Sequence, residues 1–234
     1  MMSKAFLFVV TSHDQLGATG NKTGSWLEEL AAPYWRLRDA GYQIDIASPK
    51  GGPAPLDPLS LENEWITAAG RRFRADEVAG RSLAETKRLD QVDPKDYAGL
   101  FLVGGTATVW DFPNNDALRK LIEDQFARNK VVAAVCHGVI GLTQAVDGNG
   151  EPIVKNRKVT SISNAEDVMM GLDKIVPVLP EEMLRKLRAV YSCSAPLAEH
   201  VVIDPPLFTG QNPASAAPLA RAILEHLERT HRAG

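Results

Sequence analysis

Val131-Val-Ala-Ala-Val-Cys136-His137-Gly138 is the stretch that decides the predicted fold. Its first five residues are small or β-branched and apolar, which is typical of a buried parallel strand. The strand ends at Cys136, and residues 138–145 predict a helix directly after it. A strand, a tight turn that carries a nucleophile and a helix form a nucleophile elbow, and Ala134-x-Cys136-x-Gly138 is the cysteine version of its G-x-S-x-G pattern.

The position of Cys136 favours chemistry at its sulfur. A cysteine at the start of a helix faces free N–H groups and the positive end of the helix dipole, which favour the thiolate. His137 is next to it and can accept or donate a proton. The alternative is a small buried side chain beside an accidental histidine. The strand before Cys136 and the glycine after it favour the nucleophile.

Length, charge and cysteine content limit the possible classes of protein. The chain has 234 residues, which fits one large α/β domain or a domain with a modest insertion. Its net charge of −3 and the absence of basic blocks predict that neither nucleic acid nor a membrane is a partner. Two cysteines, Cys136 and Cys193, form no disulfide framework, and the apolar run at residues 5–10 is too short for a signal sequence. We therefore expect a cytoplasmic protein, and we assign no role to Cys193.

Predicted strands and helices alternate along most of the chain. Strands are expected at residues 4–11, 42–48, 96–103, 131–135, 158–163, 200–204 and 207–209, and helices at 25–40, 114–128, 180–187 and from 213 onward. Residues 56–95 predict short helices near 60–68 and 82–89, as an insertion or edge segment. This order predicts a single domain over residues 1–234, a doubly wound α/β fold with a mostly parallel sheet between helices. Thr11, Gly105 and Cys136 follow strands, at the sheet edge where such folds place their sites.

Two neighbouring glutamates in the first predicted helix have different expected roles. Ser25 and Glu28 have the spacing of a capping box, and Gly41 is expected to end the helix in the left-handed conformation. Glu29 lies on the apolar stripe of the helix, where burial raises the pKa of a carboxyl group and suits it to general acid or base catalysis. The alternative is a surface glutamate at the edge of the stripe.

Three other short patterns bear on sites or turns. Gly104-Gly105 follows a strand, so a backbone N–H there can serve an oxyanion hole, or the pair serves close packing alone. Residues 20–23 lack the spacing of a phosphate-binding loop, and residues 147–150 predict a hairpin turn. Five scattered histidines and two distant cysteines form no metal-ligand cluster, so neither a metal nor a cofactor is expected.

Several short pieces, taken together and in order, resemble a known family. They are Thr23-Gly24 with Glu29 and Pro33, Gly41-Tyr42, Ala47-Ser-Pro-Lys-Gly-Gly52, Pro55-Leu-Asp-Pro58, Gly104-Gly105 with Trp110-Asp-Phe-Pro113, Ala134-Val-Cys-His-Gly138, Asn164 with Glu166, and Thr209-Gly-Gln-Asn-Pro213. The combination resembles the DJ-1/PfpI superfamily of the class I glutamine amidotransferase-like fold, and within it the Hsp31-like group.

The resemblance implies a flavodoxin-like sandwich and a set of site residues. In it Cys136 is the nucleophile, His137 the acid/base, Glu29 the carboxyl group beside the thiol, and Glu166 the carboxylate that orients His137. The N–H groups of Gly105 and His137 form the oxyanion hole.

The resemblance also places Gly104, Thr106 and Trp110 around the substrate. Close relatives carry Gly-Gly-His-Gly where this chain has Thr106-Ala107 after its two glycines, and often proline where it has Val139. These two departures bear on substrate preference.

The implied activity is that of a cofactor-independent glyoxalase III, which converts methylglyoxal to D-lactate through a hemithioacetal on Cys136. Deglycation of proteins would use the same residues. A second hypothesis is a stress-linked holdase chaperone or redox sensor, and a third is a hydrolase or hydratase of another small electrophile such as an isonitrile or an amide. Family members commonly form homodimers, which we expect here.

Overall fold

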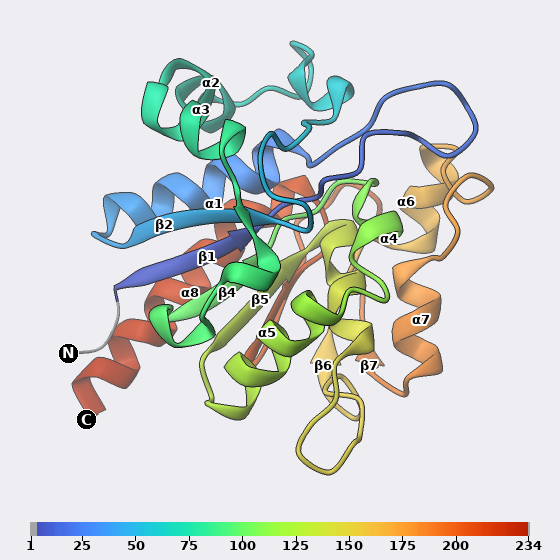
Figure 1. Cartoon of the computed structure of the whole chain (residues 1–234). Coiled ribbons are helices and arrows are strands. Elements are labelled where there is room, and N and C mark those ends of the chain that lie inside the picture. The colour runs from blue at the N-terminus through green and yellow to red at the C-terminus, as the bar shows by residue number, and fades with distance from the viewer. Residues whose placement is uncertain (1–3, 234) are drawn as a thin grey trace.

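The central element of the computed structural model, which describes residues 4–233, is a seven-stranded sheet (Figure 1). Its strand order is β3-β2-β1-β4-β5-β9-β8, and every neighbouring pair is parallel except β8 with β9. The bounds are β1 Ala5–Val9, β2 Gln43–Ser48, β3 Lys87–Arg88, β4 Gly99–Leu102, β5 Val131–Val135, β8 Val201–Asp204 and β9 Leu207–Gly210. The predicted doubly wound, mostly parallel sheet is confirmed. A separate parallel pair joins β6 (Lys158–Val159) to β7 (Val190–Tyr191).

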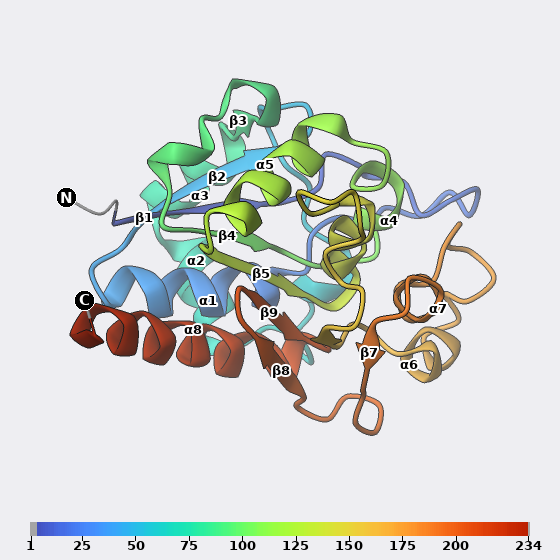
Figure 2. The ribbon, with the colours of Figure 1, turned by 90° about the horizontal axis from the view of Figure 1, so that it is seen from below.

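Helices cover both faces of the sheet. Figure 2 shows α1 and α8 side by side on one face and α5 on the other. The helices are α1 Leu27–Asp39, α2 Ala68–Ala75, α3 Glu77–Ala84, α4 Thr108–Asp111, α5 Asp116–Ala127, α6 Asn164–Met169, α7 Pro180–Lys186 and α8 Pro213–Ala233, with 3-10 turns at Pro58–Leu61, Leu89–Gln91, Pro94–Asp96 and Cys136–Gln144. None of the helices in residues 4–233 combines the length and apolar character needed to cross a membrane.

Successive side chains of the central strands point to opposite faces of the sheet, and this divides the core into two layers. In β1, Phe6 and Phe8 pack toward α1 and α8, whereas Leu7 and Val9 pack toward α5. All five residues of β5 are buried, as expected for a strand with helices on both sides. Burial of each large apolar side chain contributes about 1.5–3 kcal/mol, and these contacts hold the strand ends that carry the site.

The start of α1 differs from the prediction. The helix begins at Leu27 after Trp26, not at Ser25, so the expected capping box is wrong. Ser25 pairs in extended conformation with Leu56, and its hydroxyl accepts the N–H of Thr11. The carboxylate of Glu28 instead accepts the hydroxyl hydrogen of Thr67. At the other end Gly41 has φ +90°, as predicted.

Residues 56–95 form an edge of the sheet together with short helices. The two helices of this segment are α2 and α3, which begin after side-chain caps at Thr67 and Asp76. Both predicted helices are wrong in their bounds. Residues 62–67 are not helical and α2 begins only at Ala68, whereas residues 87–88 form β3 and pair with β2. Residues 147–150 form a turn closed by a single bridge between Val146 and Pro152.

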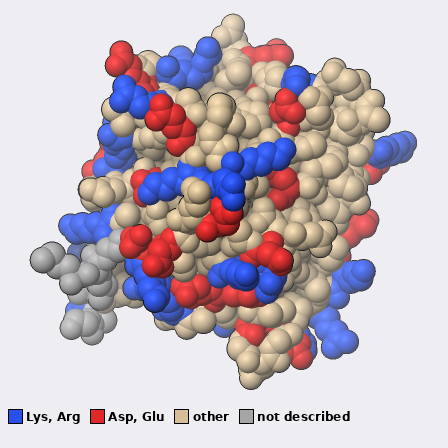
Figure 3. Space-filling model, in the orientation of Figure 1, with Lys and Arg blue, Asp and Glu red and all other residues tan. Residues whose placement is uncertain are grey.

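Charged side chains of both signs lie next to each other on the surface that Figure 3 presents. Lys and Arg residues are interspersed with Asp and Glu residues on this face, and no broad basic surface is visible there. This pattern agrees with the charge balance of the sequence, 26 basic against 29 acidic residues.

Candidate active site

The turn after β5 has the geometry of a nucleophile elbow. Cys136 has φ +55°, in the left-handed region that residues other than glycine rarely adopt. Gly138 is required by close approach, because a Cβ there would lie 2.7 Å from the carbonyl oxygen of Val103. The predicted strand and turn are therefore present, but the segment after them, Cys136–Gln144, is a 3-10 helix and not the expected α-helix.

The glycine pair after β4 lies directly against this turn. A Cβ on Gly104 would lie 2.1 Å from Oε2 of Glu29 and 2.8 Å from Cβ of Cys136. Gly105 has φ +115° and lines the cavity above the thiol. Close packing thus requires a glycine at position 104. Gly105 is also closely packed, and in addition it lies beside the Cys136 thiol.

Glu29 is buried in the floor of the cavity. Its side chain comes from α1 and has 0% exposure, so the alternative of a surface glutamate is wrong. Burial raises the pKa of Glu29 to about 8, and the nearby Cys136 thiol only partly offsets this shift. Within the described residues, neither carboxyl oxygen accepts a hydrogen bond from an N–H or O–H group, and the Cys136 thiol lies beside them. Glu29 is therefore mostly protonated at neutral pH and free to bond to a bound molecule.

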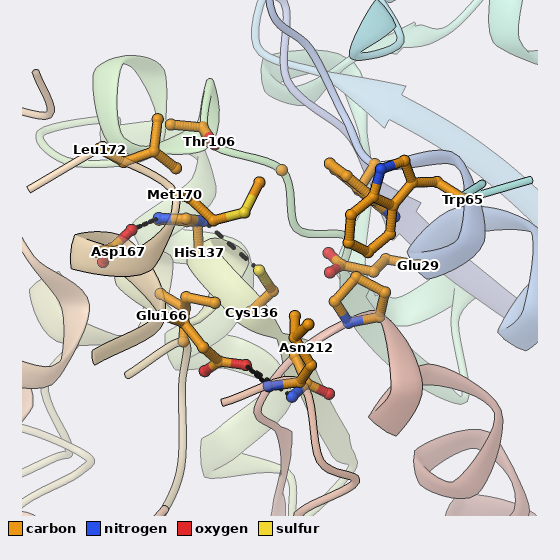
Figure 4. A pocket seen from close by; sticks show the side chains of 15 residues that line it. Glu29, Trp65, Thr106, Cys136, His137, Glu166, Asp167, Met170, Leu172 and Asn212 are labelled. Carbon is orange, nitrogen blue, oxygen red and sulfur yellow. Dashed lines mark hydrogen bonds and ion pairs between the residues drawn. The ribbon is translucent and has the colours of Figure 1, made fainter. Parts of the chain in front are cut away.

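His137 connects the thiol to a buried carboxylate. Its Nδ1 lies 3.5 Å from Sγ of Cys136, and its Nε2 lies 2.8 Å from Oδ1 of Asp167 (Figure 4). A carboxylate oxygen only accepts, so Nε2 donates to Asp167 and Nδ1 presents its lone pair to the thiol. The prediction that Glu166 orients His137 is wrong, because the next residue, Asp167, is the hydrogen-bond partner of the imidazole.

Glu166 lies in the same cavity wall but has a different set of contacts. It is the N3 residue of a capping box with Ser163 at the start of α6. Its Oε1 accepts from Asn212 Nδ2 at 2.8 Å and from the N–H of Leu197 at 3.0 Å, and its Oε2 accepts from Gln211 Nε2 at 2.9 Å. Glu166 therefore holds three separate segments together. The S-x-x-E pattern at residues 163–166 indicates the capping box, but not the hydrogen bonds to the other two segments.

The local charges control the ionisation of the nucleophile. Burial raises the pKa of the Cys136 thiol, the negative charges of Glu29 and Glu166 raise it further, and the N–H of His137 lowers it. The expectation that the helix start favours the thiolate is therefore wrong, because burial and acidic neighbours outweigh the backbone. A proton on Glu29 removes the first of these charges, so ionisation of Cys136 is coupled to protonation of Glu29.

The cavity includes predicted residues and others that sequence reasoning missed. Thr106 lines it, but Trp110 does not, and the prediction that Trp110 contacts the substrate is wrong because its ring stacks on His13 at 5.1 Å. The lining residues missed from the sequence are Trp26, Trp65, Ile162, Asp167, Met170, Leu172, Leu197, Asn212 and Pro213. Most of them come from loops, whose position no periodic pattern reveals.

The lining is acidic and apolar. Glu29, Glu166 and Asp167 contribute carboxyl groups, and in the described chain no Lys or Arg side chain lines the cavity. Residues 4–233 contain no group of three His, Cys, Asp or Glu side chains placed to hold a metal ion. The arrangement of thiol, imidazole, buried acid and backbone N–H groups can add to an electrophilic carbon and move protons around it.

Known proteins share this fold and much of this sequence. The model of the DJ-1/PfpI family matches residues 23–226. The glutathione-independent glyoxalase HSP31 of Saccharomyces cerevisiae is 28% identical over 239 residues, 97% of this chain and 100% of the relative. Glyoxalase III of Candida albicans superposes with a TM-score of 0.88 at 27% identity, covering 96% of this chain and 97% of the other. Rapid Encystment Protein 24 kDa of Francisella tularensis superposes with a TM-score of 0.90 at 38% identity, covering 94% and 96%.

Proposed function

Because the chain belongs to the DJ-1/PfpI family, we propose that it is a glyoxalase III-type enzyme that converts 2-oxoaldehydes such as methylglyoxal to 2-hydroxy acids such as D-lactate without a cofactor. One observation carries the proposal: the buried Glu29, which has a pKa of about 8 and accepts no hydrogen bond from an N–H or O–H group among the described residues, lies beside the Cys136–His137 pair. A nucleophile alone serves many reactions. An additional group that titrates near neutral pH supports proton transfer between two adjacent carbons.

The first step joins the substrate to the protein. Sγ of Cys136 adds to the aldehyde carbon of R–CO–CHO while its proton passes to Nδ1 of His137, and that proton then neutralises the new alkoxide to give a hemithioacetal. Asp167 positions the imidazole and stabilises its charged form. The N–H groups of Gly105 and His137 are the proposed donors to the developing oxyanion, each worth about 3 kcal/mol in the transition state.

The second step moves hydrogen within the substrate. Glu29, in its ionised form, takes the proton of the former aldehyde carbon and delivers it to the neighbouring carbon through an enediol. In the same step the hydroxyl proton of the hemithioacetal passes to the ketone oxygen, which leaves a thioester on Cys136. Water then cleaves the thioester and regenerates the thiol. The balance is R–CO–CHO + H2O → R–CHOH–COO⁻ + H⁺, because one carbon is oxidised as the other is reduced, so no external oxidant takes part.

The experiment measures D-lactate formed from methylglyoxal by the purified protein. We expect turnover by the wild type, a loss of at least about 10³-fold in Cys136→Ala, and a loss of at least about 10²-fold in Glu29→Gln. Cys193→Ala is the matched control, because Cys193 is exposed and Cys136 is buried; this variant should retain full activity. Absence of turnover by a wild-type protein whose Cys136 still reacts with a thiol reagent would overturn the proposal.

A second candidate function is hydrolysis of an ester or amide, favoured by the Cys136–His137–Asp167 chain of contacts. The same chain of nucleophile, base and orienting acid serves acyl transfer in hydrolases. Hydrolysis needs no proton transfer between carbons. Glu29→Gln should therefore retain activity on a p-nitrophenyl ester if hydrolysis is the reaction, and lose activity on methylglyoxal if isomerisation is.

A further inference from the structure

The mouth of the cavity has an apolar wall made of four large side chains. Trp65, Met170, Leu172 and Leu197 line it above the thiol. Figure 4 shows Trp65 on one side of the Cys136 sulfur and Met170 with Leu172 on the other. The substituent of methylglyoxal is a single methyl group, which is smaller than any one of these four side chains.

These apolar side chains contact solvent although burial would be favourable. Met170 is 37% exposed and Leu197 is 47% exposed. Exposed apolar side chains that also line a cavity offer a surface for an apolar group of a ligand. Next to them Trp65 packs edge-to-face on Trp26, with ring centroids 5.5 Å apart, and an aromatic ligand can extend this packing.

Hydrogen bonds fix the backbone of three of the wall residues. The N–H of Leu197 donates to the buried carboxylate of Glu166 at 3.0 Å. The N–H groups of Met170 and Leu172 donate to the carbonyl oxygens of Glu166 and Asp167 at 2.9 and 2.8 Å. The wall is thus built on the residues that flank the reacting groups, and a ligand need not order it on binding.

The charge of the lining limits which substituents fit. Three carboxyl groups and no Lys or Arg side chain line the cavity within residues 4–233. A substituent that carries a carboxylate or phosphate would meet like charge without a partner, which is unfavourable in a buried site. The wall therefore favours substituents that are uncharged as well as apolar.

We propose that Trp65, Met170, Leu172 and Leu197 form a subsite for the substituent R of R–CO–CHO, and that the enzyme prefers aryl and branched alkyl 2-oxoaldehydes to methylglyoxal. This inference rests on the proposed function and specifies its substrate class. The residues act on specificity through contact with R, and the chemistry at the two carbonyl carbons is unchanged.

The test compares kcat/KM for phenylglyoxal and methylglyoxal in the wild type and in single variants. For each protein, kcat/KM for phenylglyoxal is divided by kcat/KM for methylglyoxal. Dividing the ratio of a variant by that of the wild type then removes the difference in intrinsic reactivity between the two substrates. We expect the wild type to prefer phenylglyoxal by at least about tenfold, and Met170→Ala and Leu197→Ala to lower the ratio by about three- to tenfold. Both side chains are partly exposed, so these variants should fold.

Met169→Ala is the matched control. Met169 is 50% exposed and adjacent in sequence to Met170, but it does not line the cavity. Its ratio should stay within about twofold of the wild-type ratio. Unchanged ratios in both Met170→Ala and Leu197→Ala, with methylglyoxal still converted, would overturn the subsite and leave the proposed function intact. Failure of the wild type to convert either substrate would overturn the proposed function, and the subsite with it.

Discussion

Asp167 and Glu166 are adjacent acids in the first turn of α6, yet only Asp167 contacts His137. Residues one apart in a helix point about 100° apart, so the two carboxylates face different groups. Asp167→Asn should lower kcat by about 10²–10⁴-fold with a small change in KM, because an amide can present an N–H to Nε2 and select the wrong imidazole tautomer. Steady-state kinetics with methylglyoxal measures the effects on kcat and KM separately. An equal loss in kcat and gain in KM would contradict a positioning role.

The change Glu166→Gln should act on stability and on substrate binding. Glu166 accepts hydrogen bonds from Asn212, Gln211 and the N–H of Leu197, and the NH2 group of a glutamine would face at least one of these donors. We expect a loss of about 1–3 kcal/mol in the free energy of unfolding and a higher KM, with kcat reduced less than in Asp167→Asn. Urea denaturation and steady-state kinetics measure both. A kcat loss as large as that of Asp167→Asn at unchanged stability would contradict the assignment.

A further residue-scale prediction concerns pH. The pKa of Glu29 is raised from 4.5 to about 8, so between these values the folded protein keeps a proton that the unfolded chain has released. The free energy of unfolding should therefore fall as pH rises through this window, by up to about 5 kcal/mol from this group. Glu29→Gln should lack this component. Urea titrations at several pH values across the window test it, and parallel curves for the two proteins would contradict the buried, proton-binding role.

Sequence reasoning at this scale succeeded where burial followed a pattern. Glu29 was predicted from the apolar stripe of its helix, and Cys136 from the strand before it. Asp167 was missed because the choice between two adjacent acids depends on where α6 begins. The capping-box spacing from Ser163 to Glu166 would have supplied that start. The same spacing from Ser25 to Glu28 predicted a capping box that does not form, because Ser25 pairs in extended conformation with Leu56.

At the scale of elements, the close approach of β4 to α1 and β5 depends on Gly104. A methyl group on it would lie 2.1 Å from Glu29 Oε2 and 2.6 Å from the carbonyl oxygen of Val135. Gly104→Ala should lower the free energy of unfolding by about 1–3 kcal/mol and abolish most activity. Gly80→Ala is the control, because Gly80 lies in α3 and no atom lies within 4 Å of the added methyl group. The free energy of unfolding of this variant should rise by about 0.5–1 kcal/mol. Denaturant titrations would contradict this account if both variants behaved alike.

The elements themselves differed in how well the sequence predicted them. Runs of apolar residues marked β1, β4 and β5, because a strand covered on both faces is apolar at nearly every position. β2 instead alternates polar and apolar residues, and β8 lies at the edge of the sheet and is only partly buried. The segment 56–95 lacks such a run, and the bounds of its helices depend on caps at Thr67 and Asp76. Its Trp65 reaches the cavity through tertiary packing with Trp26, which no local pattern encodes.

On the scale of the whole molecule, the sheet topology explains why distant residues meet. Parallel strands β1, β4 and β5 point the same way, so the residues that follow them share one edge of the sheet. The site is completed by loops after α6 and before β8, which contribute Met170, Leu172 and Leu197. The shared edge could be predicted from the order of elements, whereas the loop contributions could not, because they depend on how the second sheet and α7 pack beside the first.

The charge of the whole chain and of the cavity predicts how product leaves. A neutral 2-oxoaldehyde enters a cavity that is lined by three carboxyl groups and, in the described chain, by no Lys or Arg side chain. The carboxylate anion of the product forms there, within a molecule of net charge −3. Like charges repel at close range, so the anion should bind weakly. We expect the inhibition constant of D-lactate to exceed that of its uncharged isostere D-lactamide by at least about tenfold, and added salt to narrow the difference. Competitive inhibition assays at low and high salt measure both constants. Tighter binding of D-lactate would mean that a cationic group reaches the site, contrary to the lining described.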